Sequence, residues 1–305
     1  MRAQDLNGSC VRFSLLRIVF VVMLSYITWT FDPILFHLAG LEVRWYCLMW
    51  ALGFFLGYMV ESRVYKREGL PDEAMDSFFI YMAIGTLIGA RIGHCFFYDW
   101  NYYSSHLLEV FIPKGGFSGL SSHGGAFGIL FSLWLFQKRV IKTKSYIWVL
   151  DRVVIAVSIC GACIRMGNLF NHEIYGFPTD LPWAFRFVEN VGAWINGAEP
   201  IFSQPSHPTQ LYEVTYCLVT FFILLYFYWK TEARKYEGFL FGVFLVCVFL
   251  TRFLLEFIKN NQEAFEDSMM FNMGQLLSIP FFLYGFYSIY KAYGKWKADK
   301  TLTRE

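Results

Sequence analysis

The residues best suited to chemistry lie in one stretch of twelve, 165–176. It reads Arg-Met-Gly-Asn-Leu-Phe-Asn-His-Glu-Ile-Tyr-Gly and follows an apolar stretch at 153–164. A charge at the end of an apolar membrane helix is costly and often marks a functional site, although arginine also anchors helix ends at lipid headgroups. The stretch therefore predicts either a polar site lining a cavity or a helix that leaves the bilayer.

A candidate general base stands at the end of a loop rich in glycine and serine. His123 is followed by Gly124 and Gly125, which leave room beside the imidazole for a substrate or another backbone. Histidine is the side chain best placed to accept a proton near neutral pH. The alternative is a histidine that caps a helix at the membrane interface.

A second arginine lies in an apolar segment near the C-terminal end of the chain. Arg252 and Glu256 are one helical turn apart and share a face, which Lys259 extends. They form either a local ion pair or part of a buried functional site, and an ion pair alone is a costly way to hold a membrane helix.

Other polar residues are less decisive. His207 and Glu213 belong either to a site or to an ordinary helix start, with Pro208 in the first turn. The spacing of the histidines predicts no metal site, and we expect no cofactor. Cys160 and Cys163 are interpreted as small apolar residues of a helix.

The elements that must position these residues are membrane helices. The chain is 56% apolar and 16% charged, whereas soluble domains carry about 25% charged residues. Net charge is +2, which gives no argument for nucleic acid as a partner. The sequence predicts an all-α polytopic membrane protein with outer-side loops forming a small head. Seven predicted spans cover 45–60, 78–98, 124–136, 146–164, 211–229, 238–258 and 273–290.

Three divisions of the chain follow. Residues 1–30 contain an additional apolar run at 11–30, which is either an anchor or a signal-like segment, and Met23 within it is an alternative start. Residues 31–295 form the predicted seven-helix transmembrane catalytic domain, in which 31–44 is an interfacial segment. Residues 296–305 form a basic cytoplasmic tail.

The distribution of basic residues predicts the orientation. Lysine and arginine are frequent in the loops 61–75, 137–145 and 230–237 and in the C-terminal tail, and sparse in the alternate loops. Because basic loops stay in the cytoplasm, the C-terminus is predicted to be cytoplasmic and the unusual polar residues to gather at the outer side.

Two glycine series predict close helix packing. Gly85, Gly89 and Gly93 recur every four residues in the second predicted span, and Gly124 and Gly128 do so in the third. Small residues at this spacing let membrane helices approach closely.

Two arginines, a candidate base and several hydrogen-bonding groups at one side of an apolar bundle suggest transfer chemistry on a phospholipid. The planar fork of arginine suits phosphate and stabilises an anionic leaving group. The alternative is a transporter or channel with a buried Arg/Glu network, although no internal repeat is apparent.

The residues 165–176 resemble the signature of the prolipoprotein diacylglyceryl transferase family, which runs Arg-x-Gly-Asn-Phe-x-Asn-x-Glu-x-x-Gly. Seven further segments resemble family segments in family order, between about residues 31 and 280. They are Phe-Asp-Pro at 31, Arg-Trp-Tyr-Cys-Leu-Met at 44, Gly-Ala-Arg-Ile-Gly at 89, Ser-His-Gly-Gly at 122, Leu-Pro-Trp-Ala at 181, His-Pro-Thr-Gln-Leu-Tyr-Glu at 207 and Arg-Phe-Leu-Leu-Glu at 252.

The resemblance implies a multi-pass enzyme of the bacterial inner membrane with its active site toward the periplasm, and we expect a monomer. It would transfer the diacylglyceryl group of phosphatidylglycerol to the lipobox cysteine of prolipoprotein signal peptides. His123, Arg165 and Arg252 match the catalytic positions. Positions matching substrate-binding or other important residues are Arg165, Tyr46, Asn168, Glu173, Gly176 and Glu256. Lys259 departs from the family, in which arginine is common there.

Overall fold

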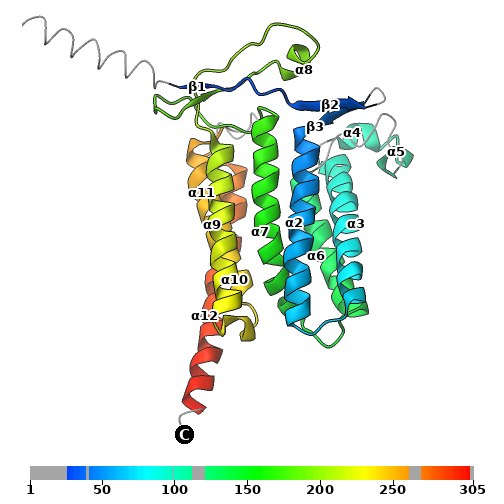
Figure 1. Cartoon of the computed structure of the whole chain (residues 1–305), viewed down its shortest axis with the longest axis vertical. Helices are drawn as coiled ribbons and strands as arrows, with labels where there is room; N and C mark the ends of the chain where they lie inside the picture. The colour runs from blue at the N-terminus through cyan, green and yellow to red at the C-terminus, as the bar shows by residue number, and fades with distance from the viewer. Residues whose placement is uncertain (1–25, 39–40, 98, 112–120, 261–268, 303–305) are drawn as a thin grey trace, which may run out of the picture. The chain divides into compact units, whose positions relative to one another are not determined.

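The computed structural model describes residues 26–38, 41–97, 99–111, 121–260 and 269–302 (Figure 1). The chain divides into two compact units. The first comprises Met1–Phe55, Ser158–Ile223 and Leu245–Gly285, and the second comprises Leu56–Val157, Leu224–Phe244 and Phe286–Glu305. Several helices contribute to both units, and each unit is described by itself.

Long helices dominate the described part of the chain. They are α2 (Trp45–Arg67), α3 (Asp72–Phe97), α6 (Ser122–Arg139), α7 (Tyr146–Phe170), α9 (Thr209–Lys230) and α12 (Met273–Leu302). Short helices are α4 (Trp100–Tyr103), α5 (Leu108–Phe111), α8 (Val191–Trp194) and η1 (Ala233–Lys235). Among the described residues, five segments are long and apolar enough to cross a membrane: α2, α3, α7, α9 and Phe239–Ile258. The predicted helical membrane class is confirmed to this extent. Large apolar side chains such as Phe55 and Phe131, each 60% exposed, suit a lipid environment.

The sixth predicted span is composite. It consists of α10 (Phe239–Leu245), the π-helical segment η2 (Val246–Leu250), α11 (Thr251–Leu255) and the 3₁₀ segment η3 (Glu256–Ile258). A π-helix is wider than an α-helix and occurs mostly as a single turn inside an α-helix, frequently at a functional site. Here the π-helical turn immediately precedes the segment that carries Arg252 and Glu256.

In the first unit, four short strands lie among the residues that the structure describes. β1 (Ile27–Thr28) pairs in parallel with β4 (Phe185–Arg186), and β2 (Ile34–Leu38) pairs antiparallel with β3 (Leu41–Arg44). The interfacial segment predicted at 31–44 is thus a hairpin that runs directly into α2. Of the N-terminal apolar run, only 26–30 are described, and β1 lies there; residues 11–25 lie outside the described residues.

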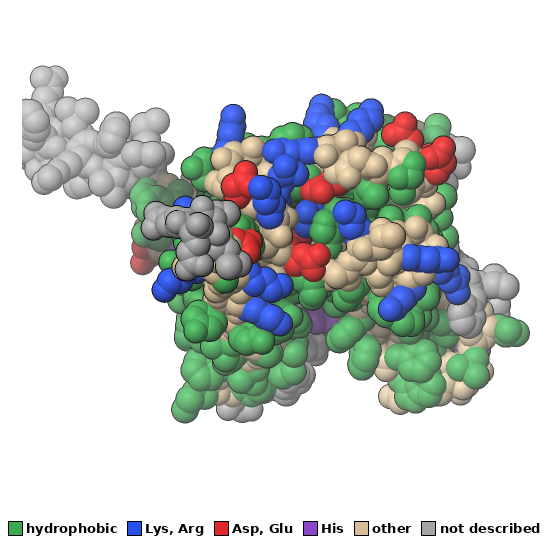
Figure 2. Space-filling model, turned by 90° about the horizontal axis from the view of Figure 1, so that it is seen from below, with side chains coloured by type: hydrophobic (Ala, Val, Ile, Leu, Met, Phe, Trp, Pro, Cys, Tyr) green, Lys and Arg blue, Asp and Glu red, His purple; other side chains and the backbone are tan. Residues whose placement is uncertain are grey.

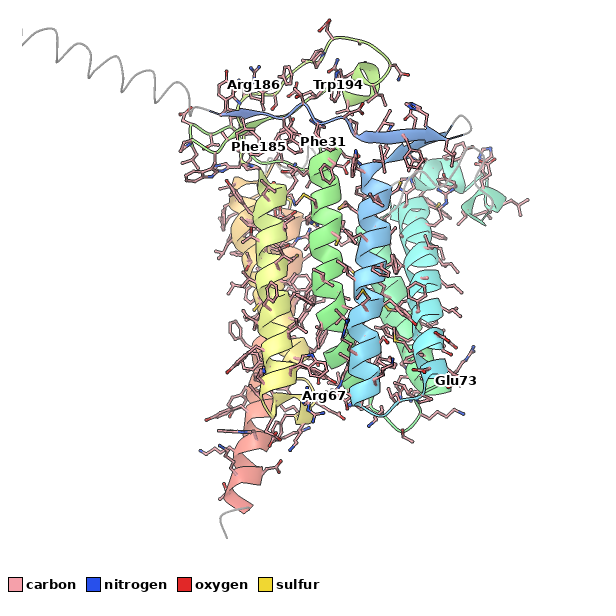
Figure 3. All side chains as sticks on the ribbon, viewed as in Figure 1. Phe31, Arg67, Glu73, Phe185, Arg186 and Trp194 are labelled. Atoms are coloured by element: carbon pink, nitrogen blue, oxygen red, sulfur yellow. The ribbon has the colours of Figure 1, made fainter. Side chains whose placement is uncertain are left out.

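An aromatic core in the first unit fixes the end of α7. Leu169, Phe185 and Phe187 are buried together, and Trp29 donates from Nε1 to the Leu169 carbonyl at 3.1 Å. Phe31, labelled with Phe185 in Figure 3, packs its ring 4.8 Å from that of Phe170. The last turn of α7 is therefore held rigidly where the stretch 165–176 begins.

In the second unit α3 and α6 touch through their backbones. A Cβ added at Gly89 would lie 2.4 Å from the Gly124 carbonyl oxygen, and one at Gly128 would lie 2.1 Å from that of Gly85. Only glycine permits such an approach, so the predicted close packing is confirmed.

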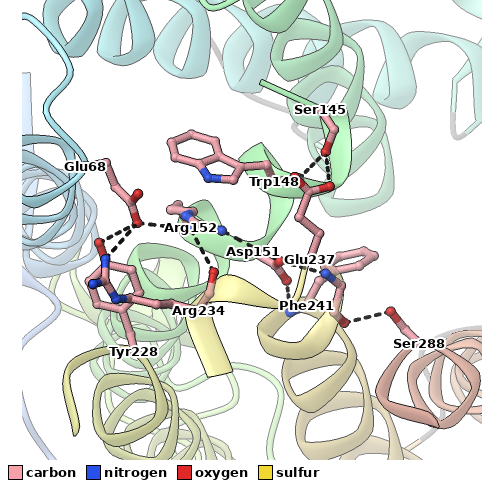
Figure 4. A network of polar contacts seen from close by, with 11 residues as sticks. Glu68, Ser145, Trp148, Asp151, Arg152, Tyr228, Arg234, Glu237, Phe241 and Ser288 are labelled. Atoms are coloured by element: carbon pink, nitrogen blue, oxygen red, sulfur yellow. Dashed lines mark hydrogen bonds and ion pairs between the residues drawn. The ribbon is translucent and has the colours of Figure 1, made fainter. Parts of the chain in front are cut away.

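A buried polar network holds the connection between α9 and α10 in the second unit (Figure 4). The carboxylate of Asp151 accepts the backbone N–H of Gly238 at 2.7 Å and of Phe241 at 2.8 Å. Arg152 donates from Nη2 to Glu68 and to the Arg234 carbonyl, both at 3.0 Å. Since unpaired N–H groups at a helix start are costly when buried, Asp151 stabilises the start of α10.

Candidate functional site

Five charged side chains of alternating sign form a continuous chain in the first unit. Arg165 Nε lies 3.0 Å from Glu213 Oε2, and Lys259 Nζ lies 3.2 Å from Glu213 Oε1. The same ammonium is 3.9 Å from Glu256 Oε1, which is 3.4 Å from Arg252 Nε. We call these five residues the charge chain.

Burial differs sharply along the charge chain. The side chains of Glu213 and Lys259 are 2% and 3% exposed, whereas those of Arg165 and Arg252 are 23% and 28% exposed. A buried charge is tolerated when paired, and each central charge here has neighbours of opposite sign. With three cations and two carboxylates, one positive charge remains, and the two guanidinium groups at the ends are its accessible part.

Neighbouring polar groups hold the Arg252 end. Asn272 donates from Nδ2 to Glu256 Oε2 at 3.1 Å. Gly274 lets this carboxylate approach, since a Cβ there would lie 2.6 Å from Glu256 Oε1. Asn272 is itself fixed by reciprocal bonds with Gln275, each side chain accepting the backbone N–H of the other residue at 3.0 and 2.9 Å.

The Arg165 end is extended by a second series of contacts. Arg165 donates from Nη1 to Asn168 Oδ1 at 3.2 Å, and Asn168 donates from Nδ2 to Glu173 Oε1 at 2.8 Å. Tyr46 packs against the backbone of α7 at Gly167, where an added Cβ would lie 2.8 Å from Tyr46 Cδ2. Tyr46 also lies within the electrostatic influence of Arg165 and Glu173.

Gly176 is a close crossing of three segments. An added Cβ would lie 2.3 Å from the Ile258 carbonyl oxygen and 2.8 Å from Thr209 Cγ2. Its N–H donates to the His207 carbonyl at 2.9 Å, and its own carbonyl accepts from Asn260 Nδ2 at 3.0 Å. A larger residue would push apart the segments that carry Glu213 and Lys259.

The structure therefore brings together seven of the eight candidate residues within the first unit: Tyr46, Arg165, Asn168, Glu173, Gly176, Arg252 and Glu256. His123 belongs to the second unit, where it is exposed in the first turn of α6. Ser121 caps that helix by accepting the N–H of Gly124 at 3.3 Å. The residues of the loop that precede Ser121, 112–120, lie outside the described residues. Within the described residues no group of three or more His, Cys, Asp or Glu could hold a metal ion.

Sequence reasoning did not identify the two central members of the charge chain. The sequence is consistent with Glu213 in a site or in an ordinary helix start, and it indicates Lys259 only as an extension of the Arg252 face. One signal was available for Glu213: it is the sole acidic residue in the mostly apolar α9. Its partners on other helices could not be read from spacing.

His172 links the start of the described chain to the loop after α7. Its Nε2–H donates to the Phe31 carbonyl at 2.9 Å, and its Nδ1 accepts the N–H of Val188 at 3.1 Å. Burial lowers the pKa of His172 below the ordinary value of 6.5, opposed in part by the bond to Phe31. A protonated ring could no longer accept from Val188.

We expect the protein to lose thermal stability as the pH falls below about 6.5, because the unfolded chain then binds a proton that folded His172 resists. The stabilising contribution is complete above that pH. His172→Gln should make the fall in melting temperature between pH 7 and pH 5 smaller than it is in wild type. The exposed His37 provides the matched control, His37→Gln. Parallel melting curves for His172→Gln and wild type would contradict this expectation.

The long apolar helices and the buried charge chain define a helical membrane protein with a polar site among apolar helices. The model of the prolipoprotein diacylglyceryl transferase family matches residues 33–291. The chain belongs to this family, which confirms the resemblance seen in the sequence.

Curated relatives agree over most of the chain. It is 44% identical to the phosphatidylglycerol–prolipoprotein diacylglyceryl transferase of Porphyromonas gingivalis, across 88% of this chain and 95% of the relative. It is 40% identical to that of Bacteroides fragilis, across 91% and 99%. It is 39% identical to that of Chloroherpeton thalassium, across 91% and 98%.

Proposed function

We propose that the protein transfers the diacylglyceryl group of phosphatidylglycerol to the thiol of the lipobox cysteine in prolipoproteins. Family membership supports the reaction, and the charge chain is the observation that carries it. The thiol sulfur bonds to C3 of the diacylglycerol, the bond from C3 to the phosphate oxygen breaks, and glycerol phosphate leaves. The thiol proton passes to a base.

The net charge of the charge chain suits the lipid. The phosphodiester of phosphatidylglycerol carries one negative charge, equal and opposite to the one positive charge left over in the charge chain. As the C–O bond breaks, negative charge grows on the departing phosphate. Guanidinium groups already fixed by Glu213 and Glu256 stabilise this charge without reorganisation.

The other candidate residues have supporting roles in this proposal. Asn168 and Glu173 orient Arg165, and Glu256 orients Arg252. Tyr46 lies beside the Arg165 end, and Gly176 permits the close crossing that assembles the charge chain. His123 is the base that takes the thiol proton. His123→Asn is expected to lower turnover by about a hundredfold or more, as general-base loss does. Full turnover in that variant would remove His123 from this role.

The same proposal includes the membrane topology. Seven spans cross the bacterial inner membrane, with the site toward the periplasm, the C-terminus in the cytoplasm and 296–305 as a basic tail. Residues 31–295 form the catalytic domain of a monomer, preceded by the extension 1–30. In support, lysine and arginine recur in the loops 61–75, 137–145 and 230–237, as expected for cytoplasmic loops. Figure 2 shows Lys and Arg side chains, with Asp and Glu among them, on the face seen from below.

The test is transfer of labelled diacylglycerol from phosphatidylglycerol to a lipobox peptide by the purified protein in liposomes. We expect transfer to the cysteine peptide, none to a Cys→Ser peptide, and release of glycerol phosphate in equal amount. If a well-folded protein leaves phosphatidylglycerol intact, the transferase proposal is wrong. Solute flux across the same liposomes would then favour a transporter.

A further inference from the structure

The turn that carries Glu173 has an unusual backbone. The residues on either side of it, His172 and Ile174, have φ values of 58° and 63°. This left-handed region is uncommon for any residue other than glycine, and for a β-branched side chain such as that of Ile174 it is a clear outlier. Such a conformation persists only where the surroundings enforce it.

Two successive side chains at the start of α9 donate hydrogen bonds to two successive backbone carbonyls of this turn. Gln210 donates from Nε2 to the Glu173 carbonyl at 2.7 Å, and Thr209 donates from Oγ1 to the Ile174 carbonyl at 2.9 Å. Both side chains belong to residues with 0% exposure. Hydrogen bonds donated by such fully buried side chains are costly to break, because the donor group is then left without a partner where water does not reach it.

The conformation of this turn places the Glu173 carboxylate next to Asn168, which contacts the charge chain. The N–H of Glu173 donates to the Asn168 carbonyl at 3.1 Å, and its carboxylate accepts from Asn168 Nδ2 at 2.8 Å. The amide oxygen of Asn168 then accepts from Arg165 Nη1 at 3.2 Å. An unbroken series of contacts thus runs from Gln210 through Glu173 and Asn168 to the guanidinium group.

We propose that Gln210 is a positioning residue for the reaction: it holds the strained turn 172–174, and thereby aims Arg165 at the phosphate. The proposal rests on the proposed function for its catalytic consequence. Gln210 acts through Glu173 and Asn168 and does not touch the reacting atoms. Without its bond, Ile174 relaxes out of the left-handed region and carries the Glu173 carboxylate away from Asn168.

Gln210→Met removes the donor and keeps the length of the side chain. We expect kcat for transfer to fall about tenfold or more, with a smaller change in KM. The reason is that the backbone strain at Ile174 is relieved when the turn relaxes, and the turn can relax once the bond from Gln210 is gone. Ile174→Gly removes the strain, since glycine adopts positive φ freely. The double variant should therefore recover to within about threefold of wild type, and Ile174→Gly alone should stay within the same range.

The matched control is Gln137→Met. Gln137 is also a buried glutamine that donates from Nε2 to a backbone carbonyl, that of Lys144, at 2.8 Å, but it belongs to the second unit and touches no member of the charge chain. Its variant should keep kcat within about twofold. A second readout is hydrogen exchange of the peptide 172–176, which should quicken in Gln210→Met and slow again in the double variant.

A merely structural role gives a different pattern. If the losses from Gln210→Met and Ile174→Gly multiply, or if Gln210→Met keeps wild-type kcat, the proposal is overturned. If wild type shows no transfer at all, the proposed function fails. The hydrogen-exchange measurement alone then tests whether Gln210 holds the turn 172–174. Faster exchange in Gln210→Met that slows again in the double variant supports the role of Gln210 in holding the turn. Unchanged exchange in Gln210→Met overturns it.

Discussion

Replacing Arg165 by alanine is expected to lower kcat/KM for diacylglyceryl transfer about a thousandfold. The guanidinium group is one end of the charge chain and is 23% exposed, so it is the part that a phosphate can reach. Loss of one fixed donor to a developing anion typically costs a hundredfold to a thousandfold, and Arg165 also carries a full charge. The measurement is steady-state transfer to a lipobox peptide in liposomes of defined phosphatidylglycerol content.

Arg165→Lys separates charge from geometry. Lysine keeps the charge but cannot reach Glu213 and Asn168 with two fixed N–H groups while presenting a third to phosphate, so we expect about a hundredfold loss. Arg186→Ala is the matched control: this half-buried arginine of the same unit donates to the Ser203 carbonyl and touches no member of the charge chain. Wild-type rates in Arg165→Lys would refute the importance of the planar fork.

Glu213→Gln is expected to be the most damaging change that does not touch the lipid. It removes the carboxylate that separates Lys259 from Arg165 and leaves the buried ammonium only Glu256, 3.9 Å away, and breaking a buried ion pair by removing one partner costs about 3–5 kcal/mol. We expect a lower melting temperature and loss of transfer by at least about a hundredfold. Lys259→Met is expected to destabilise the protein by a similar amount, because two buried carboxylates then face each other.

The double variant Glu213→Gln, Lys259→Met tests this reasoning. It removes one charge of each sign and so restores the single net positive charge of the charge chain. Removing both members of a buried pair is much less costly than removing one, so the double variant should melt above either single variant. The exposed Glu199 supplies the control, Glu199→Gln. Losses that simply add in the double variant would show that the two residues do not act as a pair.

Most residues of the site could be predicted from the sequence, but the contacts between them could not. The cluster 165–176 and the pair Arg252 and Glu256 stood out because polar residues are rare in apolar helices. Their connection through Glu213 and Lys259 depends on the rotation of α9 and η3 about their axes, which no local pattern fixes. The same holds for β1, whose partner β4 lies more than 150 residues away in the chain.

Local preference gives no sign of the strain in the turn 172–174. Nothing in the propensity of Ile174 indicates a left-handed backbone; contacts from Thr209 and Gln210 impose it. A sequence that conflicts locally with its own fold is expected where function requires an unfavourable geometry. The long helices, by contrast, follow from hydropathy, and the close contact of α3 with α6 follows from the spacing of their glycines.

The π-helical turn Val246–Leu250 has a consequence for how the gene can change in length. Each residue of an α-helix rotates the chain by about 100°, so deleting one residue from a regular helix turns everything beyond it to another face. A π-helical turn already contains one residue more than an α-helical turn needs. One residue can therefore be lost there while Arg252 and Glu256 keep their face, whereas the same deletion between Glu213 and Lys230 in α9 would turn the two halves of that helix out of register.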